Sequence, residues 1–450
     1  MKKKLWRVFI FIFILLLNAG VFCYLSYMNR SLNIEKIALQ AYNALEESYT
    51  IQITKQKDFF DFLQEDISCV AVFGQEQITD SLHDGQCTIT LPVNKNYQIS
   101  LKSPSKESSS YNLLDYLNNI LDFEFTYPKI YFIVGEETEI EFSDVLINPN
   151  EVDYQFASSD SSVVSIEDGI LKGISPGNAF ITSPLVDDKL EVVVTDLITF
   201  PTYQKKYKQH LPCNYYTEEQ ANLLDEILAY RIHKAGYQTR AAAIEAARFL
   251  TLSFPYRIPY FYENGRVHES GVNYADGEGR YYKQGLYLHE SKFSDIKATF
   301  NGPAIWGCPL TNWETDEQFG YYPGMKKPNG LDCSGFVSWV LKNAGFDPGD
   351  IGAGETEYPH QLTDLGKYTP LTVSLIDNGT VKTGDLVNYW GHIGIIVGID
   401  GENIYVAESL QNFGGVVTRL YSKYTISQTF NHVVLMDEYY KNDGNYSVMW

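Results

Sequence analysis

Residues 330–346, GLDCSGFVSWVLKNAGF, limit the possible folds of this chain more than any other stretch. They predict a helix that begins at Cys333, because Asp332 is a good N-cap residue, and that ends at Gly345. Its apolar stripe consists of Phe336, Val337, Val340 and Leu341. Cys333 therefore lies in the first turn, where unpaired backbone N–H groups and the helix dipole favour a thiolate. It is either a nucleophile or a buried structural cysteine.

A second informative stretch, TGDLVNYWGHIGIIVGIDGENIYVAES, covers residues 383–409. Its apolar runs predict three consecutive strands, so the C-terminal part of the chain is expected to be α+β. His392 opens the second of these strands. A lone histidine at such a position is more often structural, but a thiolate enzyme needs a base. Gly391 and Gly394 leave room around the ring, which favours a functional histidine.

Taken together, LDCSGFVSW and GDLVNYWGHIGIIVG resemble the NlpC-type cell-wall peptidases, which are papain-like cysteine peptidases that cleave peptidoglycan stem peptides. The resemblance covers roughly residues 300–437. It implies a papain-like α+β domain at residues 300–450, with Cys333 as the nucleophile and His392 as the general base. It also implies peptidoglycan stem peptides as substrates. We expect no cofactor, and the cysteines and histidines lack the spacing of a metal site.

A third polar group should orient His392. Members of the family commonly use His, Asn or Gln on the next strand, and this sequence departs from that pattern. It offers Glu408, whose carboxylate can accept the imidazole N–H. Asn412 is the alternative, and a different group or none also remains open.

The second departure lies upstream of the nucleophile, in GPAIWGCPL. Trp306 and Gly307 match the family, but Ala304 replaces its usual tyrosine, so Tyr321 and Tyr322 are the candidates for the phenol. The candidates for substrate contact are Asp332, Ser334, Trp306 and Tyr322. Two further residues, Cys308 and His360, are expected to be a structural cysteine and a loop residue.

The N-terminus carries Lys2, Lys3, Lys4 and Arg7, followed by an apolar run at residues 8–27. Its length predicts a transmembrane anchor within residues 1–30, and the basic tip should stay in the cytoplasm. A cleaved signal peptide and a lipid-attached Cys23 are the alternatives. We therefore expect a single-pass protein of the cell membrane with its bulk outside.

The middle of the chain divides into three segments, residues 31–115, 116–199 and 200–299. Residues 31–115 are expected to form a helical stalk over 33–63 and a small β region. Within that region Cys69 and Cys87 are either bonded across neighbouring strands or unpaired. Residues 116–199 read as an all-β sandwich, because short β-branched runs alternate with turn residues. In it, SSDSSVVSIEDGILKGISPGNAFIT resembles bacterial immunoglobulin-like group 2 domains.

Residues 200–299 are expected to contain two amphipathic helices and a tyrosine-rich segment. Thr217 and Gln220 fit a capping box at the start of the first helix, and Thr239 can cap the second. The tyrosine-rich loop at 255–290 is long enough to have a function in the substrate groove.

The formal net charge of −21 argues against nucleic acid as a partner. Our leading interpretation is a membrane-anchored, extracytoplasmic peptidoglycan hydrolase. A non-catalytic surface-binding protein and an acyltransferase or transpeptidase are the alternatives.

Overall fold

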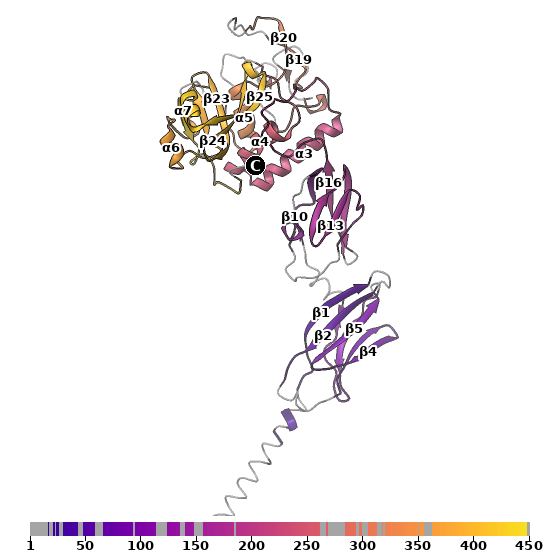
Figure 1. Cartoon of the computed structure of the whole chain (residues 1–450). Coiled ribbons are helices and arrows are strands. Elements are labelled where there is room, and N and C mark those ends of the chain that lie inside the picture. Colours follow the sequence, from indigo (N-terminus) through magenta and orange to yellow (C-terminus); the bar gives the residue numbers. More distant parts are fainter. Residues whose placement is uncertain are drawn as a thin grey trace, which may run out of the picture. The chain divides into compact units, whose positions relative to one another are not determined.

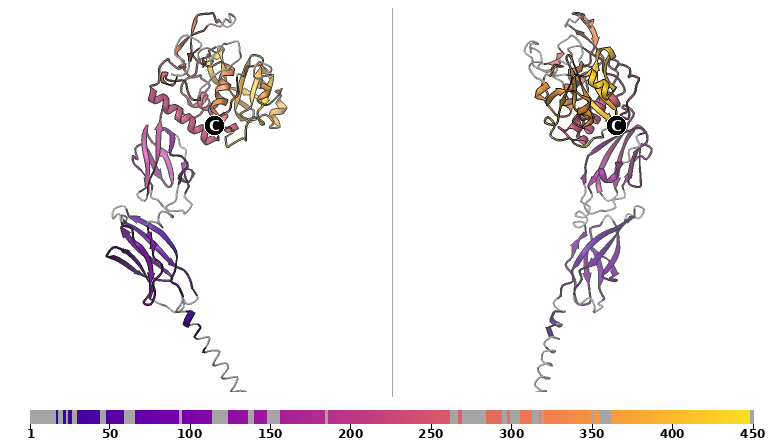
Figure 2. Two further views of the ribbon diagram at one scale, coloured as in Figure 1. Left: turned by 180° about the vertical axis from the view of Figure 1, so that it is seen from behind. Right: turned by 60° about the vertical axis from the view of Figure 1, so that its left-hand side comes forward.

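The structure of the chain is a computed structural model (Figures 1 and 2). It describes residues 30–447 with interruptions, together with residues 17, 21, 22 and 24–26. Within 30–447 the description leaves out residues 44–47, 59–65, 93–94, 114–123, 136–139, 148–155, 184–185, 262–266, 269–283, 294–296, 299–304, 313–316, 318–319, 350 and 355–361.

Most of the regular secondary structure in the described chain consists of strands in many small sheets, and its helices are few. In the described residues no helix is long and apolar enough to span a bilayer. The predicted fold class, with its N-terminal transmembrane helix, is therefore wrong. That prediction rested on the length and hydropathy of residues 8–27. A spanning helix requires such a long apolar run, but a long apolar run does not by itself show that a helix forms. Most of these residues lie outside the described part of the chain.

The predicted helical stalk is also wrong, because residues 34–55 form two antiparallel strands, β1 (Ile34–Asn43) and β2 (Ser48–Lys55). In β2 the side chains alternate between buried and less buried positions, with Ile51 and Ile53 fully buried. This is the period of a strand. The helical prediction failed because Ile34, Ile37, Leu39 and Tyr42 all lie within β1, where pairing with β2 outweighs their helical spacing.

The first compact unit contains two sheets built from residues 34–112. Their orders are β1-β2-β5 and β4-β3-β6-β7. The further strands are β3 (Ser68–Phe73), β4 (Glu76–Ser81), β5 (Gln86–Pro92), β6 (Gln98–Lys102) and β7 (Tyr111–Asn112). Both sheets contribute side chains to one apolar core, including Ile51, Ile89, Ile99 and Leu101.

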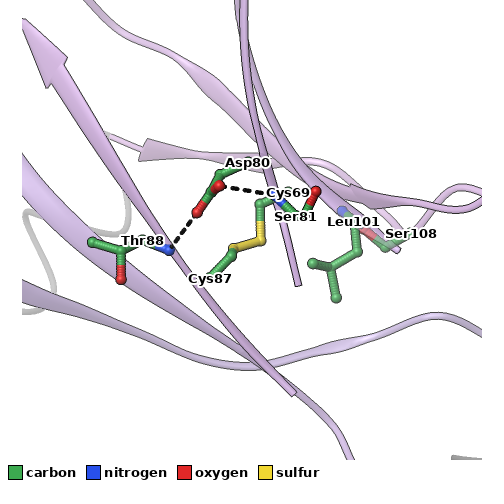
Figure 3. The surroundings of a disulfide bond; sticks show 7 residues. All are labelled: Cys69, Asp80, Ser81, Cys87, Thr88, Leu101 and Ser108. Carbon is green, nitrogen blue, oxygen red and sulfur yellow. Dashed lines mark hydrogen bonds between the residues drawn. A yellow bond between two sulfur atoms is a disulfide. The ribbon is translucent and has the colours of Figure 1, made fainter. Parts of the chain in front are cut away.

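A disulfide between Cys69 in β3 and Cys87 in β5 connects these two sheets (Figure 3). The structure thus resolves the alternatives left open for these cysteines. Beside the disulfide, the Asp80 carboxylate accepts hydrogen bonds from the backbone N–H groups of Ser81, at 2.9 Å, and Thr88, at 3.2 Å. Both sulfurs lie in the apolar core, where the disulfide links strands that belong to different sheets.

Residues 124–195 form strands with one short 3-10 turn, η2 (Phe142–Asp144), among the residues described there. Their sheets have the orders β12-β15-β16-β9, β10-β14-β13 and β11-β8. The strands are β8 (Glu124–Phe125), β9 (Lys129–Ile133), β10 (Ile140–Glu141), β11 (Leu146–Ile147), β12 (Ala157–Ser158), β13 (Val164–Glu167), β14 (Ile170–Gly173), β15 (Gly177–Ser183) and β16 (Val186–Thr195). The two-residue turn Asp168–Gly169 has positive φ at both positions, as a tight hairpin requires.

The second compact unit contains helices α3 (Glu218–Ala235) and α4 (Arg240–Arg248), followed by the π-helical turn η3 (Phe249–Ser253). Thr217 and Gln220 form the predicted capping box, and the Thr239 hydroxyl accepts from the Ala242 N–H at 3.2 Å. Both predicted helix starts are confirmed.

A six-stranded antiparallel sheet with the order β21-β26-β22-β23-β24-β25 dominates this unit (Figure 1). Helices α4 and α5 lie on one face of it, and α6 and α7 lie on the other (Figures 1 and 2). The bounds are β21 (Lys367–Pro370), β22 (Leu386–Tyr389), β23 (His392–Asp400), β24 (Asn403–Leu410), β25 (Gly415–Ser422), β26 (His432–Leu435), α5 (Cys333–Asn343), α6 (Val373–Asp377) and α7 (Lys423–Thr429). The smaller elements are β17 (Val267–His268), β18 (Lys297–Ala298), β19 (Pro309–Asn312), β20 (Met325–Pro328), η5 (Glu290–Phe293), η7 (Leu362–Asp364) and η8 (Gln411–Phe413). The three strands predicted in residues 383–409 are confirmed as β22, β23 and β24.

A buried cation connects α4 to this sheet. Arg240 is fully buried and donates to Asp385, just before β22, at 2.8 Å and to Asp443 at 2.8 Å, and it also pairs with Asp437. A buried charge needs such partners because it has lost its water. The segment 200–299 therefore packs into the same unit as the strands that follow it.

A second disulfide, Cys213–Cys308, joins residues that lie 95 positions apart in the sequence. No spacing pattern predicted this pair. It confirms that Cys308 is structural, and it leaves Cys333 as the free cysteine among the residues that the structure describes.

Candidate active site

Cys333 lies in the first turn of α5, as the sequence predicts. The helix begins there because the Asp332 carboxylate accepts the Gly335 N–H at 2.7 Å. Cys333 is buried, with 7% of its surface exposed. Ser409 in β24 donates to the Leu331 carbonyl at 2.6 Å and so holds the start of α5 against the sheet.

His392 is the first residue of β23 and lies beside this helix start. Its side chain interacts electrostatically with that of Cys333. On its other side, Nε2 lies 2.7 Å from Oε2 of Glu408 in β24. The antiparallel register pairs Glu408 with Gly394, two residues after the histidine, which explains why the two side chains meet. Because Glu408 engages Nε2, Nδ1 is the nitrogen left for the thiol.

Burial of His392 disfavours its charged form, but the hydrogen bonds and negative charges of Cys333 and Glu408 outweigh burial and raise its pKa from 6.5 to about 9. An imidazolium is therefore favoured at neutral pH. This cation can hold a neighbouring thiolate in its ionised form, which is the reactive form of cysteine.

Glu408 is fully buried and uses both carboxylate oxygens. Oε1 accepts the Tyr421 hydroxyl at 2.8 Å and lies 3.4 Å from a guanidinium nitrogen of Arg419. Burial, together with the charge of Glu408, raises the pKa of Tyr421, so its hydroxyl remains a donor. Tyr421 and Arg419, both in β25, thus help to keep the carboxylate oriented toward His392.

Sequence reasoning missed Tyr421, Arg419 and two residues of β22. The Tyr389 ring lies 5.1 Å from the His392 imidazole, and burial, together with the charges of Glu408 and Cys333, raises its pKa. The Asn388 side chain donates to the His392 carbonyl at 2.9 Å and so fixes the backbone of the histidine. For Asn388 and Tyr389 the only signal in the sequence was that they precede the histidine, separated from it by a two-residue turn.

The four predicted substrate contacts have different positions. Asp332 and Ser334 are buried at the start of α5, where Asp332 acts as the helix cap. Trp306 is buried in the core against Tyr287 and Trp339, so its indole does not face solvent. Tyr322 is 48% exposed in the turn before β20.

The remaining predictions concern the orienting residue and the upstream motif. Asn412 lies in η8, after the end of β24, whereas Glu408 bonds the imidazole directly. Ala304 and His360 lie outside the described residues, as does most of the tyrosine-rich loop at 255–290.

The structure thus places a thiol beside an imidazole that is hydrogen-bonded to a carboxylate. This arrangement can ionise the thiol and return its proton to a leaving group. A scan of the sequence against known protein families finds no matching family, and a search of curated proteins finds no similar sequence.

Proposed function

We propose that the chain is a cysteine endopeptidase that cleaves stem-peptide amide bonds of peptidoglycan through an acyl-enzyme. One observation carries the chemical part of this proposal: Cys333, at a helix start, interacts electrostatically with His392, whose Nε2 lies 2.7 Å from Oε2 of Glu408. A purely structural cysteine needs neither a charged imidazole nor a buried carboxylate behind it.

The thiolate of Cys333 attacks the carbonyl carbon of the scissile amide, and its sulfur forms a bond to that carbon. The developing negative charge on oxygen is placed near the first turn of α5, whose backbone N–H groups can stabilise it. The His392 imidazolium then gives its proton to the amide nitrogen. The C–N bond breaks, the amine leaves, and a thioester remains.

Water completes the reaction. Neutral His392 takes a proton from the water molecule, whose oxygen attacks the thioester carbonyl. The carbon–sulfur bond breaks, and the products are a carboxylate and the regenerated thiolate–imidazolium pair. Glu408 stabilises the imidazolium at each stage, without itself accepting the proton.

The substrate class rests on the resemblance of LDCSGFVSW and GDLVNYWGHIGIIVG to the NlpC-type peptidases. The two disulfides favour an oxidising compartment outside the cytoplasm, where peptidoglycan is found. The net charge of −21 gives no attraction to an acidic cell wall, so recognition should depend on shape and hydrogen bonds.

The test is digestion of purified muropeptides by the full chain and by its Cys333→Ala variant, with the products analysed by mass spectrometry. We expect the wild type to produce a new free carboxylate and the variant to be inactive. Cleavage at the same rate by both proteins would contradict the role of Cys333. A new amide or ester in place of a carboxylate would instead identify an acyltransferase.

A further inference from the structure

The turn between β22 and β23 carries an unusual side chain. Of the large apolar side chains that the structure describes, Trp390 is the most exposed, at 88%. A single exposed apolar residue is common and needs no explanation by itself. What calls for one is that Trp390 directly precedes Gly391, whose carbonyl contacts the candidate nucleophile.

The backbone holds Trp390 firmly in this place. The strand pair Tyr389–His392 closes a two-residue turn made of Trp390 and Gly391. Gly391 has φ +85°, a conformation that favours glycine. The carbonyl of Gly391 lies 3.9 Å from the sulfur of Cys333. The indole is thus one residue away from a group that contacts the nucleophile, and two away from His392.

We infer that Trp390 forms a subsite for the substrate side chain next to the cleaved bond, and that this subsite accepts neutral or cationic aliphatic chains and disfavours acidic ones. The inference rests on the proposed peptidase function. An extended peptide advances about 3.3 Å per residue. Trp390 lies one position before the residue whose carbonyl contacts the sulfur, so it is placed to reach the nearest substrate residues. A sugar farther along the glycan is therefore a poorer candidate.

The chemical preference follows from the ring. An indole offers a broad apolar surface with a partial negative charge on its face, which attracts methylene groups and ammonium ions and repels carboxylates. Because the side chain is already exposed and held by a tight turn, binding requires little rearrangement of the backbone.

The experiment uses the full chain and three forms of one synthetic stem peptide. In each form a lysine follows the γ-glutamyl bond, and its side-chain amine is free, acetylated or succinylated. These forms are cationic, neutral and anionic at the same position. We expect the wild type to cleave the first two with a kcat/KM about tenfold higher than the third.

Trp390→Ala should raise KM about tenfold for the free and acetylated peptides and reduce the discrimination against the succinylated one to less than about threefold. Trp390→Phe should retain most of the discrimination. Tyr424→Ala is the matched control, because Tyr424 is an exposed aromatic residue on α7, with 68% exposure.

Alkylation of Cys333 by iodoacetamide separates the peptidase hypothesis from the subsite hypothesis. Its rate reports the reactivity of the thiolate in the absence of any peptide. If Trp390→Ala alters neither KM nor the discrimination while Cys333→Ala is inactive, the subsite is refuted and the peptidase function stands. If the wild type cleaves no form of the peptide, or if Cys333→Ala cleaves as well as wild type, the proposed function fails and the subsite fails with it. A slower alkylation in Trp390→Ala would show that the indole supports the nucleophile and is not a subsite.

Discussion

Replacing Glu408 with Gln isolates the contribution of the buried carboxylate. The amide keeps the size of the side chain and an oxygen that can accept from Nε2, but it removes the negative charge. In the wild type the pKa of His392 is raised from 6.5 to about 9, which corresponds to about 3 kcal/mol in favour of the imidazolium. Cys333 and Glu408 together supply this free energy, and they also offset the cost of burying the imidazolium.

Glu408 supplies part of that free energy, so loss of its charge should weaken the ion pair by roughly tenfold, which is about 1 kcal/mol. We expect kcat/KM to fall by about this factor. Because the pKa is raised to about 9, the imidazolium is present at neutral pH and is lost as the pH rises through about 9. In Glu408→Gln this loss should begin at least about one pH unit lower.

Two measurements test this expectation without the physiological substrate. The pH dependence of Cys333 alkylation reports the thiolate, and NMR of ¹⁵N-labelled histidine reports the imidazole, with the His392 signal assigned from its absence in His392→Asn. Glu402→Gln is the matched control, because Glu402 lies at the turn between β23 and β24 and is 81% exposed. If the His392 pKa in Glu408→Gln stays near 9, the carboxylate does not stabilise the imidazolium and our reasoning is refuted.

Three further outcomes are expected. Tyr421→Phe removes a 2.8 Å hydrogen bond from the orienting carboxylate. It should lower kcat/KM about 3- to 10-fold and move the alkaline limb of the pH profile to lower pH. An unchanged pH profile would contradict this expectation. Arg240→Met leaves the buried Asp385 without its 2.8 Å partner and should cost about 3–5 kcal/mol in urea unfolding of the full chain; a cost below about 1 kcal/mol would show that the cation is not needed. Replacing both Cys213 and Cys308 with Ala opens a loop of 95 residues and should cost about 4–5 kcal/mol by the chain-entropy estimate, so a thermal unfolding midpoint equal to that of the wild type would contradict it.

The sequence alone determined the features that depend on neighbours a few residues away. The cap residues Asp332, Thr217 and Thr239 act on backbone N–H groups within three positions, so the helix starts were predictable. The apolar runs of residues 383–409 similarly predicted β22, β23 and β24. Cys333 and His392 could be identified as candidates because each opens one of these elements.

Tertiary structure decided whatever depends on partners far apart in the chain. Residues 34–55 became strands because pairing with β5 buries one face of β2 in a shared core, and this outweighs the helical spacing of their apolar residues. The partner of Cys308, the burial of Trp306, and the contact of Tyr421 with Glu408 likewise depend on how strands and loops come together. Local preferences cannot specify these contacts, because they form only when the chain folds and its distant segments are packed against each other.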